Sequence, residues 1–282
     1  LVNFVSALAS GGFKKIIFFH SVPLWQKGEI PRIDEEKVEE AKKRFAIAQA
    51  NPPEGIEIII EVSSGRPLDT IPRFLKNHPV DIIFIGTPIR SLLQEKVFGS
   101  TTMGLTKLTS TPLAILRPQL LSTYTSEELT LRCQNLWRSL SIPYNDSKAA
   151  QYLIDRLKNY LSNPQQHNPK SCTLIWIIEE SRQKFLTDSR LQEAETKLSS
   201  IKSELENLGC QVDCKIQVGS PLPTLLETTA NLDISAIAIA ADSQQNFFQR
   251  AVPSFAEELL RRSWFPLLFF SCPNPKRNPK NA

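Results

Sequence analysis

Two glycines, and the hydroxyl side chains that follow the second one, are the groups in this sequence best suited to hold a phosphate. Gly86 ends an apolar run, and Gly99 directly precedes Ser100 and Thr101. A glycine lets the backbone approach an anion closely, and a tight turn into a helix directs amides and hydroxyls at that anion. Between the two glycines, Ile89 carries a β-branched side chain, and such a residue does not readily adopt positive φ. The spacing therefore predicts a phosphate site that is partly eroded.

Signatures of catalysis and of metal binding are missing from the sequence. The three histidines, His20, His78 and His167, are scattered along the chain. No nucleophile elbow, zinc-protease helix or complete P-loop motif is present. The cysteines are odd in number and lack C-x-x-C spacing, so we expect no metal site and no enzyme, but buried, reduced thiols in a reducing cytoplasm. These cysteines are Cys133, Cys172, Cys210, Cys214 and Cys272.

Charge and hydropathy argue against nucleic-acid and membrane partners. The net charge of +4 is small for 282 residues, and the basic residues near the end lie among prolines and asparagines, as is typical of a solvated tail. The sequence contains no Lys/Arg run with interleaved aromatic residues. No stretch approaches the ~20 apolar residues that a membrane span needs. We therefore expect neither kind of partner.

An internal repeat organises the chain. The run Gly-Arg-Pro-Leu that begins at Gly65 recurs as Gly-Ser-Pro-Leu from Gly219, which is 154 residues later. Pro112 recurs as Pro266 at the same spacing, and the apolar run before Gly86 recurs before position 240. Several landmarks at one spacing indicate a duplicated domain. The length of 282 residues also fits two domains of ordinary size.

Segments typical of strands and helices alternate in both copies. In the first copy we expect strands at 15–22, 56–62, 80–86 and 113–116, and helices at 1–9, 34–50, 69–77 and 99–108. In the second copy we expect strands at 139–144, 172–178, 212–218, 234–239 and 267–270, and helices at 148–161, 191–208 and 255–262. Asp69 is predicted to cap its helix. The alternation predicts an α/β fold with two doubly wound parallel-sheet domains in tandem.

Comparison of the copies indicates the domain boundaries and one missing strand. The second copy begins with a strand at 139–144, whereas the first begins with a helix. We therefore expect the equivalent strand of the first domain to lie upstream of residue 1. The predicted parts are a first domain at 1–118, a polar linker at 119–136, a second domain at 137–272 and a polar basic tail at 273–282.

The spacing of the phosphate site resembles the motif of ATP-binding universal stress proteins. That family carries G-x2-G-x9-G-[ST] after its fourth strand, and the matching positions here are Gly86, Ile89, Gly99 and Ser100. The segment at 110–116 is also similar to the final strand of that family, which is entered through a proline. The resemblance implies the universal stress fold in both copies and ATP as the ligand at Gly86, Gly99, Ser100 and Thr101. It implies no other cofactor.

The second copy has lost the motif. The corresponding positions are Ala240, Ser243, Pro253 and Ser254, so no motif glycine survives and we do not expect this domain to bind nucleotide. On the leading strand, Asn145 stands where the family has an acidic residue. Asp146 beside it is predicted to be a helix cap or turn residue.

Together these features predict a non-catalytic stress-response or regulatory protein of the universal stress type. We expect it to act as a scaffold or interaction protein for a protein partner that the sequence does not name. The final strands at 113–116 and 267–270 are expected to pair edge to edge, within the chain as a pseudo-dimer or between chains in a homodimer, because exposed edges need cover. Two alternatives stay open: an ATP-responsive regulator, and a nucleotide-dependent enzyme of the same superfamily.

Overall fold

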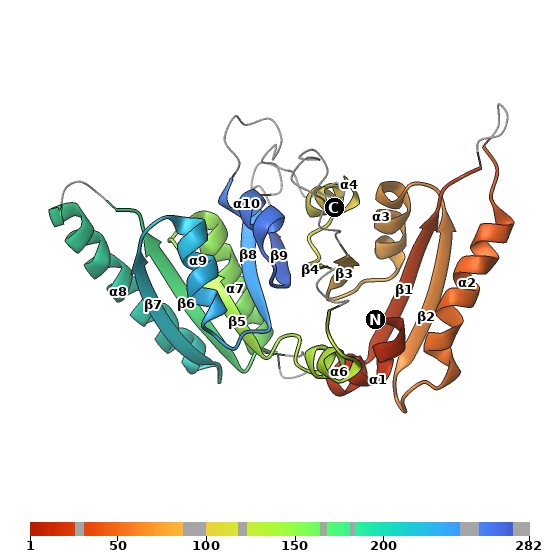
Figure 1. Ribbon diagram of the computed structural model, residues 1–282, viewed down its shortest axis with the longest axis horizontal. Coiled ribbons are helices and arrows are strands. Elements are labelled where there is room, and N and C mark those ends of the chain that lie inside the picture. The colour runs from red at the N-terminus through yellow and green to blue at the C-terminus, as the bar shows by residue number, and fades with distance from the viewer. Residues whose placement is uncertain are drawn as a thin grey trace.

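The structure is a computed structural model that describes residues 1–25, 31–86, 100–117, 123–163, 168–180, 184–242 and 254–272. Figure 1 shows two α/β halves side by side, with the first half in red to yellow and the second in green to blue. Helices α1 and α6 lie between the halves at one end of the molecule.

The helices and strands follow the alternating order that the sequence predicts. The first half contains a 3₁₀ helix at Val2–Phe4, α1 (Val5–Ser10), β1 (Lys15–Val22), α2 (Glu35–Ala50), β2 (Glu57–Ser64), α3 (Pro67–Asn77), β3 (Ile83–Gly86), α4 (Ser100–Leu108) and β4 (Leu113–Leu116). Helix α6 (Ser126–Gln134) follows. The second half contains β5 (Ser139–Pro143), α7 (Lys148–Leu161), β6 (Ser171–Ile178), α8 (Lys184–Glu206), β7 (Gln211–Val218), α9 (Pro221–Ala230), β8 (Ala236–Asp242), α10 (Phe255–Arg262) and β9 (Leu267–Cys272).

The strands form one sheet of seven and one sheet of two. The larger sheet has the order β3-β4-β9-β8-β5-β6-β7, and the smaller one pairs β1 with β2. Every pair within a half is parallel, which confirms the predicted α/β class with parallel sheets in two tandem units. Among the described strands, β4 and β9 pair antiparallel, with Ala114 opposite Leu268, and this pair makes the sheet continuous between the halves.

The first half differs from the second in the middle of its sheet. In the second half, β5 lies between β6 and β8 and pairs with both. In the described part of the first half, no strand lies between β1 and β3, which are the equivalents of β6 and β8. Among the described residues, β1 and β2 therefore form a sheet that is separate from β3 and β4.

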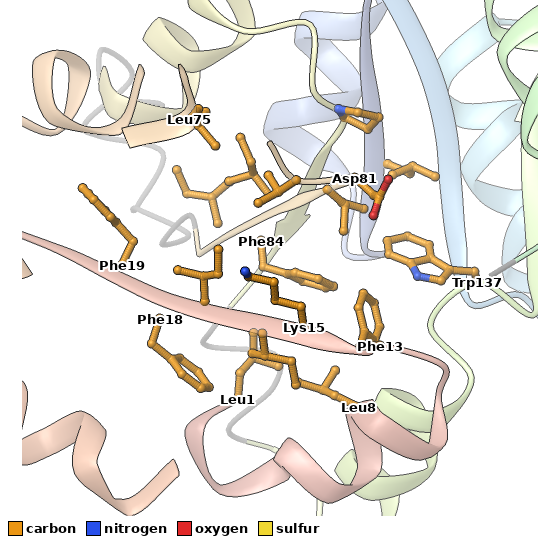
Figure 2. Close-up of a pocket in the computed structure, with 18 of the residues that line it drawn as sticks. Leu1, Leu8, Phe13, Lys15, Phe18, Phe19, Leu75, Asp81, Phe84 and Trp137 are labelled. Atoms are coloured by element: carbon orange, nitrogen blue, oxygen red, sulfur yellow. The ribbon is translucent and has the colours of Figure 1, made fainter. Parts of the chain in front are cut away.

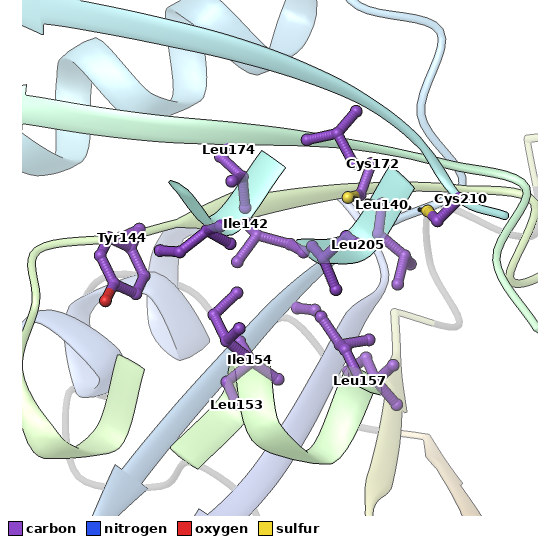
Figure 3. Close-up of a cluster of buried hydrophobic side chains, with 14 of the residues drawn as sticks. Leu140, Ile142, Tyr144, Leu153, Ile154, Leu157, Cys172, Leu174, Leu205 and Cys210 are labelled. Carbon is purple, nitrogen blue, oxygen red and sulfur yellow. Dashed lines mark hydrogen bonds between the residues drawn. The ribbon is translucent and has the colours of Figure 1, made fainter. Parts of the chain in front are cut away.

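The apolar core covers both faces of the seven-stranded sheet. Along β9, Leu268 and Phe270 contribute to one cluster, while Leu267 and Phe269 contribute to the other. This division follows from the alternation of side chains along a strand. Figure 3 shows the first cluster, in which Leu174 and its neighbours on β5 and β6 face the helical side chains of α7. Both faces of the sheet are thus buried, as a doubly wound fold requires.

Helix α3 begins earlier than predicted, and the prediction that Asp69 caps it is wrong. The helix begins at Pro67 and its N-cap is Arg66, which makes no side-chain cap hydrogen bond. Asp69 lies inside the first turn, and Pro72 lies inside the helix. Pro67 explains the earlier start, because the fixed φ of proline suits the first helical position and its missing N–H is not needed there.

The segment predicted as a linker contains helix α6. The Thr125 hydroxyl accepts a hydrogen bond from the Glu128 amide at 3.2 Å, and the Glu128 carboxylate accepts one from the Thr125 amide at 2.8 Å. These two bonds form a capping box, which satisfies two amides that would otherwise lack partners at the start of the helix. The Thr-x-x-Glu spacing was visible in the sequence and identifies the start of this helix.

Gly11 allows α1 and α6 to pack closely. A Cβ atom at this position would lie 2.7 Å from the Cys133 carbonyl oxygen and 3.2 Å from the Gln134 Cα atom. Both neighbours are backbone atoms, so they have little freedom to move aside. We expect Gly11→Ala to lower the free energy of unfolding by about 1–3 kcal/mol, since overpacking forces the two helices apart. Urea denaturation measures this change, and an effect no larger than that of the exposed-site control Ser10→Ala would contradict it.

Candidate functional site

The positions predicted to hold a phosphate lie at the carboxyl end of β3 and at the start of α4. Gly86 is the last residue of β3, is exposed and pairs with Leu116 on β4. Ser100 is the first residue of α4, and Thr101 follows it in a half-buried position. Ile89 and Gly99 lie outside the described residues. The flanking strand and helix are therefore in place, and phosphate binding by the loop stays a prediction.

Two of the four equivalent positions in the second half, Ala240 and Ser254, are described by the structure, and both make contacts within the chain. Ala240 is half-buried in β8 and pairs with Phe270 on β9. The Ser254 hydroxyl accepts a hydrogen bond from the Glu257 amide at 3.3 Å and so caps α10. A hydroxyl that caps its own helix satisfies one of the free amides to which an anion would bind. Ser243 and Pro253 lie outside the described residues.

Asp146 forms a hydrogen-bond network at the carboxyl end of β5. Its carboxylate accepts hydrogen bonds from the Tyr144 hydroxyl at 3.0 Å and from the Gln151 side-chain amide at 2.9 Å. Lys197 of α8 forms an ion pair with the same carboxylate. The backbone of Asp146 has a φ of 58°, in the left-handed region, which aspartate tolerates better than most residues. The carboxylate is thus held by three donors from three segments of the chain.

The network shifts the acid–base equilibria of its members. The hydrogen bond from Lys197 is the main cause that lowers the pKa of Asp146 to about 2, and the bonds from Gln151 and Tyr144 add to it. Burial raises the pKa of the Tyr144 phenol, and the hydrogen bond to Asp146 raises it further. Asp146 is therefore a stable carboxylate at neutral pH, and Tyr144 is a neutral donor.

The neighbours of Asp146 are also engaged within the chain. The Asn145 side-chain oxygen accepts a hydrogen bond from the Ser147 amide at 3.3 Å. The Ser147 hydroxyl in turn accepts one from the Ala150 amide at 3.3 Å and caps α7. The cap therefore belongs to Ser147, and Asp146 is the turn residue of the two roles predicted for it.

A large, mainly apolar cavity lies between β1 and β3, and second-half residues such as Leu140, Leu157 and Phe270 also line it. Its volume is about 760 Å³. Figure 2 shows Phe18 and Phe19 of β1 on one side, while Phe13, Phe84 and Trp137 gather at one end. The strands β1 and β3 are the equivalents of β6 and β8, between which β5 lies in the second half. No motif in the sequence indicates this cavity.

The thiols are only partly as predicted. Cys133, Cys172 and Cys210 are buried and free, but Cys214 is exposed and Cys272 is half-buried. Cys214 lies on β7, an edge strand of the larger sheet. Among the residues that the structure describes, no group of His, Cys, Asp or Glu side chains is arranged to hold a metal ion. None of the described helices is long and apolar enough to span a membrane.

The sequence of the first half matches a family model. The universal stress protein family model matches residues 13–117, which include β1 to β4 and the predicted phosphate site. This segment of the chain is therefore similar to the universal stress protein family. No curated protein matches the chain in sequence.

Solved structures of universal stress proteins share the fold over nearly the whole chain. A universal stress protein from Archaeoglobus fulgidus has a TM-score of 0.65 at 17% identity, with 96% of this chain and 90% of that chain covered. A putative universal stress protein from Pseudomonas aeruginosa has a TM-score of 0.53 at 12% identity, with 93% and 95% covered. A Pseudomonas aeruginosa protein of unknown function gives 0.52 at 10%, with 93% and 94% covered. Both halves therefore have the universal stress protein fold.

Contacts within the chain occupy the polar side chains described at the carboxyl edge of the second half. In the second half, the described polar side chains at 145–147 and 254 bind other groups of the same chain. Sequence reasoning missed the contact between Asp146 and Lys197, which are separated by 51 positions along the chain. No local spacing could have revealed it, because only the packing of α8 brings the lysine to the strand end.

The Asp146 network makes a testable contribution to the pH dependence of stability. The pKa of Asp146 is lowered in the folded state. The stabilisation from its charged form is therefore present above the ordinary carboxyl pKa and is lost as the pH falls from about 4 to about 2. Asp146→Asn keeps a side chain that tolerates positive φ but removes the charge. We expect the variant to unfold at a lower temperature than the wild type at pH 6, with the difference shrinking toward pH 2. A constant difference across this range, measured by thermal unfolding, would contradict the assignment.

Proposed function

We propose that this protein is a non-catalytic regulatory protein of the universal stress type, which acts in the cytoplasm as a scaffold or interaction protein. In this proposal the ATP site of the first half is eroded and that of the second half is lost. The main support for this proposal comes from the carboxyl ends of the strands in the second half. There the Asp146 carboxylate and the Ser254 hydroxyl already bind other groups of the same chain. A ligand there would have to displace these bonds.

The pairing of β4 with β9 supports a scaffold role. The fully buried side chains of Leu113, Ile115, Leu267 and Phe269 pack in one cluster along this pair. Because the edges of the two final strands cover each other, the halves form a pseudo-dimer within one chain. The proposed partner is another protein that binds the outer surface of this pseudo-dimer. A homodimer through the same strands, the other predicted arrangement, would require β4 and β9 to separate, because each has a neighbour on both sides.

A nucleotide-responsive regulator is the second candidate. This candidate is favoured by the order of elements at the carboxyl end of β3 in the first half, where Gly86 ends the strand and α4 begins at Ser100. A strand followed by a loop and a helix N-terminus is an arrangement that suits anions. In this candidate, ATP at the first half would alter the surface that the partner binds.

Nucleotide content and calorimetry decide between the two candidates. The purified full-length protein is denatured, its nucleotides are resolved by chromatography, and a second sample is titrated with ATP and magnesium. The scaffold proposal expects no co-purified nucleotide and no heat of binding. Micromolar binding that is lost in Gly99→Val, but kept in the matched second-half variant Pro253→Val, would favour the nucleotide-responsive candidate instead. Turnover of ATP to ADP or AMP would indicate an enzyme and overturn both.

A further inference from the structure

The side chains of Cys172 and Cys210 meet in the apolar core of the second half. Cys172 lies at the start of β6, and Cys210 directly precedes β7. Their Sγ atoms are 3.9 Å apart, which is within the reach of a hydrogen bond between thiols. Figure 3 shows both side chains at one end of the first cluster, with their sulfur atoms directed toward each other. Two thiols from separate segments of the chain are thus neighbours in the fold.

The packing of the fold does not itself require these two cysteines. The register of the strands aligns Cys172 with Ile16 of the first half, and the spacing of 154 residues aligns Cys210 with Ile56. Aliphatic side chains therefore fill the same place in the first half. The thiol pair is a feature of the second half, and its chemistry needs a separate explanation.

Cys210 belongs to a turn whose outer side is open to solvent. The amides of Gly209 and Cys210 donate hydrogen bonds to the carbonyls of Glu206 and Leu205, at 2.9 and 3.2 Å, and so end α8. Gly209 has a φ of 86°, and a Cβ atom added there would meet no other atom within 4 Å. Cys210 is buried, but its neighbours Gly209 and Gln211 are exposed. A small opening of this turn is therefore enough to expose the Cys210 thiol to a small oxidant.

The two thiols differ in acidity. The hydrogen bond between them lowers the pKa of Cys210. The same bond raises the pKa of Cys172, and burial raises it further. Because the thiolate is the nucleophilic form of cysteine, Cys210 is the thiol of the pair that reacts first. Cys172 is then in position to react with the product.

We propose that Cys172 and Cys210 form a reversible disulfide when the protein is exposed to hydrogen peroxide. The Cys210 sulfur attacks one peroxide oxygen, the O–O bond breaks, and one water leaves with the thiol proton, so that Cys210 becomes a sulfenic acid. The Cys172 sulfur then attacks the Cys210 sulfur, the S–O bond breaks, and a second water leaves. One peroxide is thus reduced to two waters while two thiols are oxidised to one disulfide. A small-molecule thiol reverses the reaction by thiol–disulfide exchange.

The disulfide would move the turn between α8 and β7. A disulfide bond is about 2.05 Å long, so the sulfur atoms must approach each other by about 2 Å from their present 3.9 Å. Strand β6 is held between β5 and β7, whereas the turn lies at the surface, so the turn makes most of this movement. Disulfides in a reducing compartment are usually transient bonds of this kind. The proposal is independent of the scaffold role and of ATP binding.

Peptide mapping of the full chain after peroxide treatment tests the proposal. The reduced protein is treated with a small excess of hydrogen peroxide, unfolded in an alkylating reagent, digested and analysed by mass spectrometry. We expect a peptide pair joined through Cys172 and Cys210, the loss of two of the five alkylated thiols, and full recovery of both after dithiothreitol. Cys133, which is also buried and free, controls for burial alone and should stay a thiol.

Three variants make the result specific. Cys172→Ala removes the second thiol, so peroxide should leave Cys210 as a sulfenic acid that a dimedone probe traps. Cys210→Ala should leave Cys172 as a thiol. Cys214→Ala removes the exposed thiol on β7 and should form the disulfide at an unchanged rate. Retention of both buried thiols in the unmodified protein, at peroxide concentrations that oxidise Cys214, would overturn the proposal. A disulfide that includes Cys214, or a sulfinic acid at Cys210 without a linked peptide, would overturn it as well.

Discussion

Replacing Phe269 by alanine is expected to lower the free energy of unfolding by about 3–5 kcal/mol, which is the usual cost of a large-to-small change at a buried aromatic residue. Phe269 is fully buried in β9, where it lies opposite Leu113 of the first half and beside Ile239 of the second. The cavity left by the substitution would therefore form where the two halves join.

Urea denaturation of the full chain measures this effect, and Leu131→Ala supplies the control. Leu131 lies on α6 with 59% of its surface exposed, so its removal should change stability by about 0.5 kcal/mol or less. Equal effects of the two substitutions would show that the contact between β4 and β9 contributes little to stability.

The second large effect is expected at Leu174, and its counterpart in the repeat provides the control. Leu174→Ala should destabilise the protein by about 3–5 kcal/mol, because Leu174 of β6 is fully buried in a cluster with side chains of α7 and α8. Phe18→Ala removes a larger side chain at the equivalent position of β1, since Phe18 pairs with Ile60 as Leu174 pairs with Cys214, and Ile60 and Cys214 are 154 residues apart. Phe18, however, is half-buried and borders the cavity. We expect it to cost about 2 kcal/mol or less, since less apolar surface returns to water.

Denaturant unfolding of both variants tests this comparison. Similar losses at the two positions would mean that β1 is as well covered as β6, so that the cavity is closed in solution.

Much of the architecture was predictable from local patterns in the sequence. Side chains alternate along strands and recur every three to four residues along helices, so apolar periodicity predicted nearly every described element. Helix α7 has the predicted bounds, and β4 does as well. The repeat also predicted that the first half lacks its leading strand. The start of α6 was encoded in the Thr125 capping box but was overlooked.

The sequence by itself determined the α/β class, the tandem repeat and the loss of the glycine motif from the second copy, because these depend on residue type and spacing alone. Only the tertiary structure decided which residues meet. The register that sets Ala114 opposite Leu268 and the ion pair between Asp146 and Lys197 join segments far apart in the chain. The contrast in burial between Phe18 and Leu174 has the same origin, since both are apolar strand residues and differ in what packs on them. Such contacts depend on the order of the strands in the sheet and on how the helices pack against it. The spacing of residues along a short segment predicts neither.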